Sequence, residues 1–532
     1  MKRWGPLVVL AAAQFVMVLD QAVMNVSISQ LVKDFDTSVT AIQAVITLYS
    51  LTMAMFMVAG GKIGDIIGRK RAFIVGLAIY GCGSLVTALS QSVWTLALGW
   101  SVLEGIGAAL VLPALAALVA GNYADKSRLT AYSVIGGVAG AGIAVGPIVG
   151  GWATTALSWR VVFAGEVVLV LGILACIRLL RDAPNPGTKP KLDTLGAALS
   201  ALGLGLIVLG VLQASTWGWI QPKHSPLTPF GFSLTPFVVG AGATLMYAFV
   251  KWQQYREARA KDPLVHLQLF SITPLRAGLQ ALLSQNLILM GIFFTIPLYL
   301  QLVLGLDALE SGIRMLPASV AMFLAAIAGA SLAERFSTRT IIRAGIIAAA
   351  VGSFFLLAYI DPQLNEGGFA ISMALLGVGT GLMASQLGNV VQSSVDASGR
   401  SEAGGLQYTA QQLGSSLGVA LIGAIVLSGL IGSFASRVEN DPRISSTVKQ
   451  QVSVSVSGNV SFVSADQVRT SAEQAGVPPA EVNVLVENYE ESQLKALKAG
   501  LFAAGLIAIA ALFFTKGLPS KKPERMPMAA SQ

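Results

Sequence analysis

Three acidic residues, Asp20, Glu104 and Glu166, lie inside long apolar stretches of the sequence. An aspartate at the centre of a membrane helix costs roughly 2.5 to 3.5 kcal/mol, so acids at such positions indicate a functional site. Removal from water favours the protonated form of a carboxyl group, whereas the ionised form attracts a cation. The three residues are therefore candidates for exchanging protons against a cationic substrate. The structural alternative is that each carboxyl group hydrogen-bonds a neighbouring helix and only holds the helices together.

The composition identifies the apolar stretches as membrane spans. Of 532 residues, 54% are hydrophobic and 12% are charged, and the mean hydropathy is +0.70, which excludes a series of soluble domains. Cys82 and Cys176 lie in apolar stretches and His224 and His266 in separate loops, so the sequence predicts no disulfide framework and no metal site. The net charge of +8 comes from bases between the spans, so it indicates membrane topology rather than a nucleic-acid partner.

Fourteen apolar segments are long enough to cross a bilayer. The first continues to about residue 28, which predicts an uncleaved helix rather than a secretory signal. The others fall near 41–61, 72–89, 94–119, 131–154, 160–178, 194–214, 235–254, 276–304, 313–333, 341–360, 369–391, 405–430 and 494–515. An even number of spans places both termini on one side of the membrane. The basic loops and the tail with Lys521, Lys522 and Arg525 predict that this side is cytoplasmic.

The spans follow the order six, two, six, which predicts two six-helix repeats with an inserted pair. The predicted parts are an N-terminal bundle in 1–178, a linker with the inserted helices in 179–260, helices 9 to 13 in 261–430, an external segment in 431–493, and the last helix with its tail in 494–532.

A short basic turn joins the second and third spans and carries Gly61, Asp65, Gly68, Arg69 and Lys70. The glycines let two helix ends approach closely, and Asp65 can either accept hydrogen bonds from a helix N-terminus or pair with a nearby arginine. The spacing resembles the loop signature G-x-x-x-D-x-x-G-R-[RK] of the major facilitator superfamily, with Ile66 where many members carry a base. The resemblance implies a cytoplasmic latch for the outward-open state.

The fifth span contains Gly142, Gly146, Pro147, Gly150 and Gly151. Glycines at positions i, i+4 and i+8 form a smooth groove for close helix packing, and the proline frees a backbone carbonyl and permits a bend. The pattern resembles the antiporter signature G-x-x-x-G-P-x-x-G-G, which in the superfamily marks exporters.

The first span, with Leu19, Asp20, Asn25 and Val26, resembles the signature L-D-x-T-x-x-N-V of the drug/proton antiporters, although Ala22 replaces the threonine. In the fourth span the family commonly reads R-x-x-Q-G, whereas this chain has Ser101 in place of the arginine and Glu104 in place of the glutamine, followed by Gly105.

The sixth span has Glu166 where the related pattern usually has asparagine. These changes predict a cavity more acidic than is usual in the family, so the usual proton relay cannot simply be assumed. Asn25, Tyr408 and Gln411 are candidates for its polar lining.

The external segment 431–493 is the one sizeable soluble part that the sequence predicts. Alternation of valine and serine over 452–457, a turn at Gly458 and Asn459, and a return over 460–463 predict a β-hairpin. Ser464 with Gln467 predicts the start of a short helix ending at Gly476, and Pro478 and Pro479 predict another that continues into the last span.

The resemblance implies an all-α, fourteen-helix drug/proton antiporter that works by alternating access. The expected partners are a small molecule, protons and membrane lipid; the proton motive force replaces any cofactor, and a monomer is the expected working unit. Export of a lipid or an endogenous metabolite is the alternative on the same fold. A membrane-embedded enzyme and a non-transporting sensor are more distant alternatives.

Overall fold

The computed structural model of the chain describes residues 4–123, 125–182, 191–223, 225–396, 399–459 and 462–520. Met1 to Arg3, residues 183–190 of the predicted linker and the basic tail 521–532 lie outside the described residues. Within the described ranges, all regular secondary structure is helical. The all-α prediction is therefore confirmed for this part of the chain.

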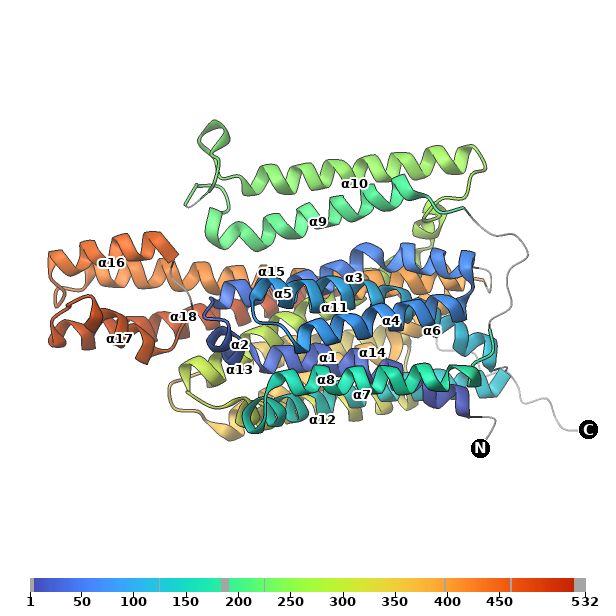
Figure 1. Cartoon of the computed structure of the whole chain (residues 1–532), viewed down its shortest axis with the longest axis horizontal. Helices are drawn as coiled ribbons and strands as arrows, with labels where there is room; N and C mark the ends of the chain where they lie inside the picture. The colour runs from blue at the N-terminus through green and yellow to red at the C-terminus, as the bar shows by residue number, and fades with distance from the viewer. Residues whose placement is uncertain are drawn as a thin grey trace, which may run out of the picture.

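The N-terminal six predicted spans all correspond to observed helices, drawn in blue to teal in Figure 1. Their bounds are α1 (Gly5–Val26), α2 (Ile28–Asp34), α3 (Val39–Ile67), α4 (Arg69–Ala88), α5 (Val93–Leu96), the π-helix η1 (Ala97–Glu104), α6 (Gly105–Asn122), α7 (Asp125–Ala156), α8 (Trp159–Ala175) and η2 (Cys176–Leu179). The fourth span is composite, because α5, η1 and α6 follow one another without a break.

The inserted pair and the C-terminal helices follow in the predicted order. Their bounds are α9 (Thr194–Trp217), η3 (Pro229–Gly231), α10 (Thr235–Ala258), η4 (Leu267–Ser271), α11 (Thr273–Leu298), the π-helix η5 (Tyr299–Val303), α12 (Ala308–Leu332), α13 (Thr338–Tyr359), α14 (Glu366–Ser393), α15 (Arg400–Asn440), α16 (Ser446–Asn459), α17 (Ala465–Gln474), α18 (Pro479–Ala511) and η6 (Leu512–Gly517).

Twelve helices in the described part of the chain are long and apolar enough to cross a membrane. The count rises to thirteen if the two parts of α7, Val134–Ile143 and Val145–Ala156, which are bent by 41°, form one span. Helix α10 is not among them, because its last third, 251–258, is largely polar. The multi-pass membrane architecture is confirmed, while the total of fourteen spans stays a prediction.

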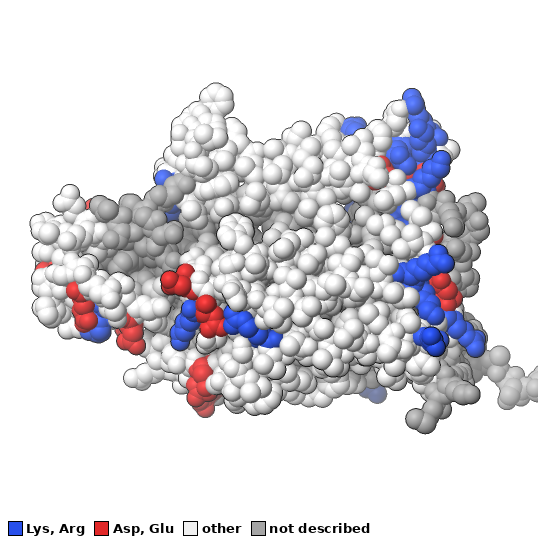
Figure 2. Space-filling view, in the orientation of Figure 1, with Lys and Arg blue, Asp and Glu red and all other residues white. Residues whose placement is uncertain are grey.

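The long helices run side by side, and their charges gather at the two ends of the molecule (Figures 1 and 2). The surface between these ends is nearly free of charge in Figure 2, as the hydrocarbon core of a bilayer requires. We call the end where α1 begins the terminal end; Lys and Arg are concentrated there. The opposite end carries α16 and α17 and is called the cap end.

The two groups of six spans form two halves, and α9 lies along the seam between them. It packs against α3 of the N-terminal half and α15 of the C-terminal half. The contact buries Leu51, Val208, Leu212 and Ala420 in one apolar cluster. Helix α10 packs on α9, on the side away from the bundle (Figure 1).

The predicted β-hairpin is wrong. Its first strand and its turn lie in helix α16, and part of its return strand, 460–461, lies outside the described residues. An isolated two-stranded hairpin is only marginally stable in water. The helix instead packs against α15, with Val448 buried.

The helix signals in the same segment are confirmed. Ser464 accepts a hydrogen bond from the amide of Gln467 and forms a capping box at the start of α17. Gly476, with φ of +75°, follows the end of this helix. Pro479 begins α18, which continues into the last span.

Candidate functional site

The three acids predicted from the sequence come together in the N-terminal half. Asp20 lies on α1, Glu104 at the end of η1 and Glu166 on α8. One carboxylate oxygen from each lies within 4.8 Å of the others. We call these three side chains the carboxyl cage.

Helix α4 positions two of the cage acids. Glu166 Oε2 accepts hydrogen bonds from the hydroxyls of Tyr80 and Ser84, each at 3.3 Å. Glu104 Oε1 accepts one from Thr87 Oγ1 at 3.1 Å. Gly83 makes room for Glu104, since a Cβ at this glycine would lie 2.6 Å from Glu104 Cγ. The π-helical turns of η1 fit this arrangement, because such insertions are frequent at functional sites.

Asp20 is held by an aromatic pair that the sequence reasoning missed. The Trp100 indole Nε1 donates a hydrogen bond to Asp20 Oδ1 at 2.7 Å. Tyr49 stacks on Trp100 with ring centroids 4.5 Å apart and an interplanar angle of 6°. Both rings are almost fully buried. A signal was available, because Trp100 stands one helical turn before Glu104 in the same span.

Each cage residue keeps one carboxylate oxygen without a hydrogen-bond partner among the described residues. These atoms are Asp20 Oδ2, Glu104 Oε2 and Glu166 Oε1. Buried polar atoms normally have partners, so three neighbouring acids that each keep such an atom indicate a site for a proton or another ligand.

A polar cluster at the cap end fixes the start of α8, the helix that carries Glu166. Asp34 Oδ2 accepts hydrogen bonds from Trp159 Nε1 at 2.8 Å and from Arg160 Nη1 at 3.1 Å. The Arg160 guanidinium also lies over the Trp159 ring, 4.4 Å from its centroid. Burial alone raises the pKa of Asp34, but the hydrogen bonds from Trp159 and Gln30 and the charge of Arg160 hold this pKa below its ordinary value.

The glycines of α7 form the predicted groove, and α1 lies in it. A methyl group at Gly146 would overlap the Cβ of Ala22, and one at Gly150 would lie 2.9 Å from the Cα of Val23. These contacts set the position of α1 within two or three residues of Asp20.

We therefore expect Gly146→Val to destabilise the N-terminal half strongly, by about 1 to 3 kcal/mol or more, because its side chain must displace α1. Thermal unfolding of the purified protein in detergent measures this effect. The matched control is Gly172→Val on α8, where a Cβ meets nothing within 4 Å. Equal unfolding temperatures for the two variants would contradict the proposed groove.

Pro147 frees a backbone carbonyl, as predicted. It has no amide N–H to give to the carbonyl of Ile143, and that oxygen instead accepts a hydrogen bond from Ser319 Oγ of α12 at 3.2 Å. Gly151 also faces α12, where a Cβ would lie 2.8 Å from the Cα of Leu309. The α7 pattern thus contacts α1 in its own half and α12 in the other half.

Hydrogen bonds join the two halves in the part of the bundle nearer the cap end. Most of the donors are side-chain amides and hydroxyls, and most of the acceptors are backbone carbonyls. Besides the bond from Ser319 to Ile143, these bonds include Gln21 Nε2 to Gln412 Oε1 (3.3 Å), Gln301 Nε2 to the Val26 carbonyl (2.7 Å), Ser29 Oγ to Gln301 Oε1, Gln43 Nε2 to the Val419 carbonyl (2.8 Å), Ser416 Oγ to the Thr47 carbonyl (3.3 Å) and the Leu309 amide to Thr155 Oγ1 (3.3 Å).

The predicted polar lining is placed only in part at this seam. The amide of Asn25 is buried and donates to the Gln21 carbonyl of its own helix at 2.8 Å. Tyr408 and Gln411 are half-buried on α15, within one turn of Gln412, which makes the contact across the seam.

The match to a family model covers most of the chain: residues 10–419 match the model described as Major Facilitator Superfamily. The chain belongs to the major facilitator superfamily. It is 28% identical to the tetracenomycin C resistance and export protein of Streptomyces glaucescens, with 100% of this chain and 95% of that protein covered. It is 29% identical to the multidrug efflux pump LfrA of Mycolicibacterium smegmatis, with 80% of this chain and 81% of that protein covered.

The fold of this superfamily member is also seen in solved structures. One is the structure of a bacterial homologue of the human lysosomal transporter Spinster. The match covers 97% of this chain and 98% of the homologue, with a TM-score of 0.60. At 15% sequence identity this likeness concerns the fold alone. The comparisons place the chain among transporters rather than enzymes.

The superfamily loop signature forms a closed polar turn. Arg69 forms an ion pair with Asp65 and donates to the Gly61 carbonyl at 3.0 Å, while Gly68 has φ of +99°. The Lys70 ammonium donates to the Leu180 carbonyl at 2.7 Å, which ties the turn to the end of the sixth span. The predicted pairing of Asp65 with an arginine is confirmed.

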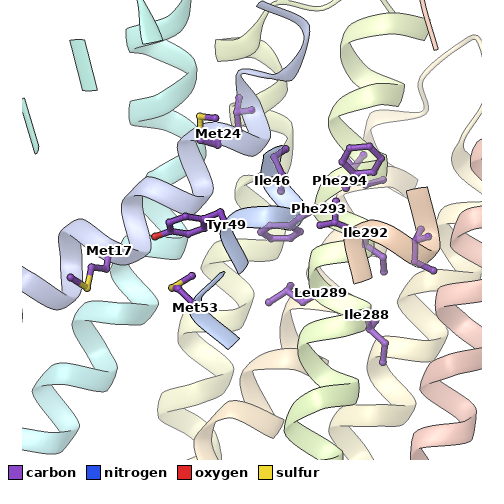
Figure 3. Close-up of a cluster of buried hydrophobic side chains, with 14 of the residues drawn as sticks. Met17, Met24, Ile46, Tyr49, Met53, Ile288, Leu289, Ile292, Phe293 and Phe294 are labelled. Atoms are coloured by element: carbon purple, nitrogen blue, oxygen red, sulfur yellow. The ribbon is translucent and has the colours of Figure 1, made fainter. Parts of the chain in front are cut away.

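Buried apolar side chains form a cluster where the two halves of the transporter meet, and we call this cluster the apolar surface (Figure 3). Met17 and Met24 come from α1, and Tyr49 and Met53 come from α3. The labelled α11 residues are Ile288, Leu289, Ile292, Phe293 and Phe294. Each of these labelled side chains is at most 6% exposed, so the apolar surface is packed in this conformation.

Proposed function

We propose that the protein is a proton-coupled antiporter that exports small amphiphilic or cationic organic compounds across the cytoplasmic membrane by alternating access. The observation that carries this proposal is the carboxyl cage, which is buried in one half and lies close to the seam. Tyr49 connects the carboxyl cage with the apolar surface. It stacks on Trp100, which binds Asp20, and it is itself one of the residues of the apolar surface. The names of the relatives, which refer to drug resistance and export, support the same function.

The topology proposed for this function has fourteen spans. They are the twelve long apolar helices, the bent helix α7 and, as the fourteenth, α10. Both termini and the Gly61 to Lys70 turn lie in the cytoplasm, because Lys and Arg gather at the terminal end (Figure 2). The turn acts as the latch of the outward-open state. A single chain contains both halves, so the monomer is the proposed working unit.

In this orientation the hydrogen bonds across the seam lie toward the outside, and they hold the outer side of the seam closed. A movement of the halves uncovers the apolar surface between α1, α3 and α11, and an organic substrate from the cytoplasm then contacts it. Methionine side chains there adapt to ligands of different shape. The halves then rock to open the cap end. Protons that enter the cage from outside drive the return, so inward proton flow drives export.

Export of a metabolite made by the cell is the second candidate. The relative from Streptomyces glaucescens, named for both resistance and export, favours this reading. Export of a lipid would use the same apolar surface and the same cycle. The two candidates differ from drug export in substrate and not in mechanism.

Inside-out vesicles with an acid interior and a pH-sensitive dye test the proposal. Lipophilic cations, anionic drugs, amphiphilic lipids and secreted aromatic metabolites are added in turn. We expect proton release on addition of lipophilic cations and none from vesicles without the protein. Release only with metabolites or lipids would replace drug export by the second candidate, and no release with any compound would reject proton-coupled export.

A further inference from the structure

The carboxyl cage is closed to large molecules. Asp20 and Glu104 are 0% exposed and Glu166 is 1% exposed. Trp100 covers Asp20, and Gly83 packs so closely on Glu104 that a single methyl group would not fit between them. An organic cation therefore has no room beside these carboxylates in this conformation, and the cage takes up only protons or a bare ion.

The cage also has acceptors that no protein cation satisfies. Among the ion pairs of the described residues, none includes a cage acid. The neutral groups of Trp100, Thr87, Tyr80 and Ser84 each bind one oxygen, which leaves the second oxygen of each acid unpaired. Burying an ionised carboxylate without a partner is costly, so any negative charge in the cage calls for a cation.

A fourth oxygen is directed to the same place. The Tyr49 side chain is only 1% exposed, and its hydroxyl lies within hydrogen-bond reach of Asp20 and makes no bond to a group outside the cage. Figure 3 shows this hydroxyl pointing from α3 toward α1, the helix that carries Asp20. Its ring is stacked on Trp100, the residue that donates to Asp20 Oδ1.

We propose that the carboxyl cage binds one divalent metal cation through oxygens of Asp20, Glu104 and Glu166, with the Tyr49 hydroxyl as a further ligand. Donor sets made only of oxygen suit Mg²⁺, Ca²⁺ and Mn²⁺. Metal–oxygen distances of about 2.0 to 2.6 Å place two oxygens on opposite sides of an ion about 4 to 5 Å apart. The three carboxylate oxygens already lie within 4.8 Å of one another, so a small inward shift of the side chains lets one ion reach all of them.

Charge balance favours a divalent ion. The cage is neutral when it holds three protons, and it is neutral again when one divalent ion replaces two of them and the third carboxyl group stays protonated. The inference deepens the proposed function, because it adds a second occupant to the site proposed for protons.

Metal binding to the full-length protein in lipid nanodiscs tests the proposal. After treatment with a chelator, the protein is titrated with MnCl₂, CaCl₂ or MgCl₂, with NaCl and choline chloride as ionic-strength controls. We expect saturable binding of one Mn²⁺, Ca²⁺ or Mg²⁺ per chain by calorimetry, and an unfolding temperature raised by several degrees. Glu104→Gln and Glu166→Gln, which keep the side-chain shape, each lose at least about tenfold in affinity. Glu490→Gln, an exposed acid on α18, keeps the affinity of the unmodified protein.

The outcomes separate this proposal from proton-coupled export. No divalent binding up to millimolar concentration, stabilisation by NaCl alone, or equal affinity in Glu490→Gln and in both cage variants would overturn the metal site. If the cage variants do not fold, the titration of the unmodified protein still decides whether one ion binds, and Tyr49→Phe, which removes only a hydroxyl, locates it by a loss of affinity. Substrate-induced proton release without metal binding leaves export standing, whereas metal binding without proton release supports the cage and counts against export.

Discussion

Asp20→Asn is expected to abolish substrate-induced proton release from inside-out vesicles, down to the level of vesicles that lack the protein. Asparagine has nearly the same shape as aspartate, and its side-chain oxygen can still accept the hydrogen bond from Trp100 Nε1. It cannot take up or release a proton near neutral pH. The variant therefore keeps the packing of α1 and loses only the exchange of charge, and its unfolding temperature should stay close to that of the unmodified protein.

Glu104→Gln and Glu166→Gln separate a single proton carrier from a shared site. If only Asp20→Asn loses proton release, Asp20 is the sole carrier and the other two acids tune it. Loss in all three variants indicates that the cage works as one unit, which its short oxygen separations favour. Normal proton release from a folded Asp20→Asn variant would show that Asp20 carries no proton in the cycle.

Much of the site could be predicted, because its signals are local to single helices. Spacing alone places Gly142, Gly146 and Gly150 on one face, and that face receives α1. A proline in a helix always frees the carbonyl four residues before it, so a partner for the Ile143 oxygen could be expected. Acids inside apolar spans are expensive wherever they stand, so Asp20, Glu104 and Glu166 were visible as candidates without any knowledge of their contacts.

Other features depend on how helices meet, and the sequence does not specify this directly. The roles of Trp100 and Tyr49 follow from the depth at which the fourth and second spans pass Asp20, and the π-helical turns of η1 affect that depth. The helix over 446–459 is a similar case. Its alternating valines and serines fit a strand locally, but a strand there has no sheet to join, whereas a helix has α15 to pack against.

Gly312→Val is expected to stop transport and leave the protein folded. A Cβ at Gly312 on α12 would overlap the carbonyl oxygen of Pro147 on α7, and backbone atoms of a helix cannot move aside as a flexible side chain can. This contact joins the two halves, unlike the contact of Gly146 with Ala22, which lies within one half. Each half can therefore still fold, but the halves cannot close at the cap end. Substrate-induced proton release should fall to background. The unfolding temperature of Gly312→Val should stay close to that of the unmodified protein, whereas that of Gly146→Val should be much lower.

A cysteine in the seam reports the expected change in conformation directly. Ser319→Cys, in a background with Cys82→Ser and Cys176→Ser, places a thiol at a position of α12 that is 0% exposed and faces α7. A membrane-impermeant maleimide added from the outside should label this thiol slowly in the otherwise unmodified transporter and much faster when Gly312→Val is also present. Gly240→Val on α10, where a Cβ meets nothing within 4 Å, is the matched control and should change neither labelling nor transport. If Gly312→Val transports normally and its thiol stays protected, close packing of α7 on α12 is not what closes the cap end. In that case the glutamine contacts across the seam, from Gln43 and Gln301, become the elements that hold the halves together there.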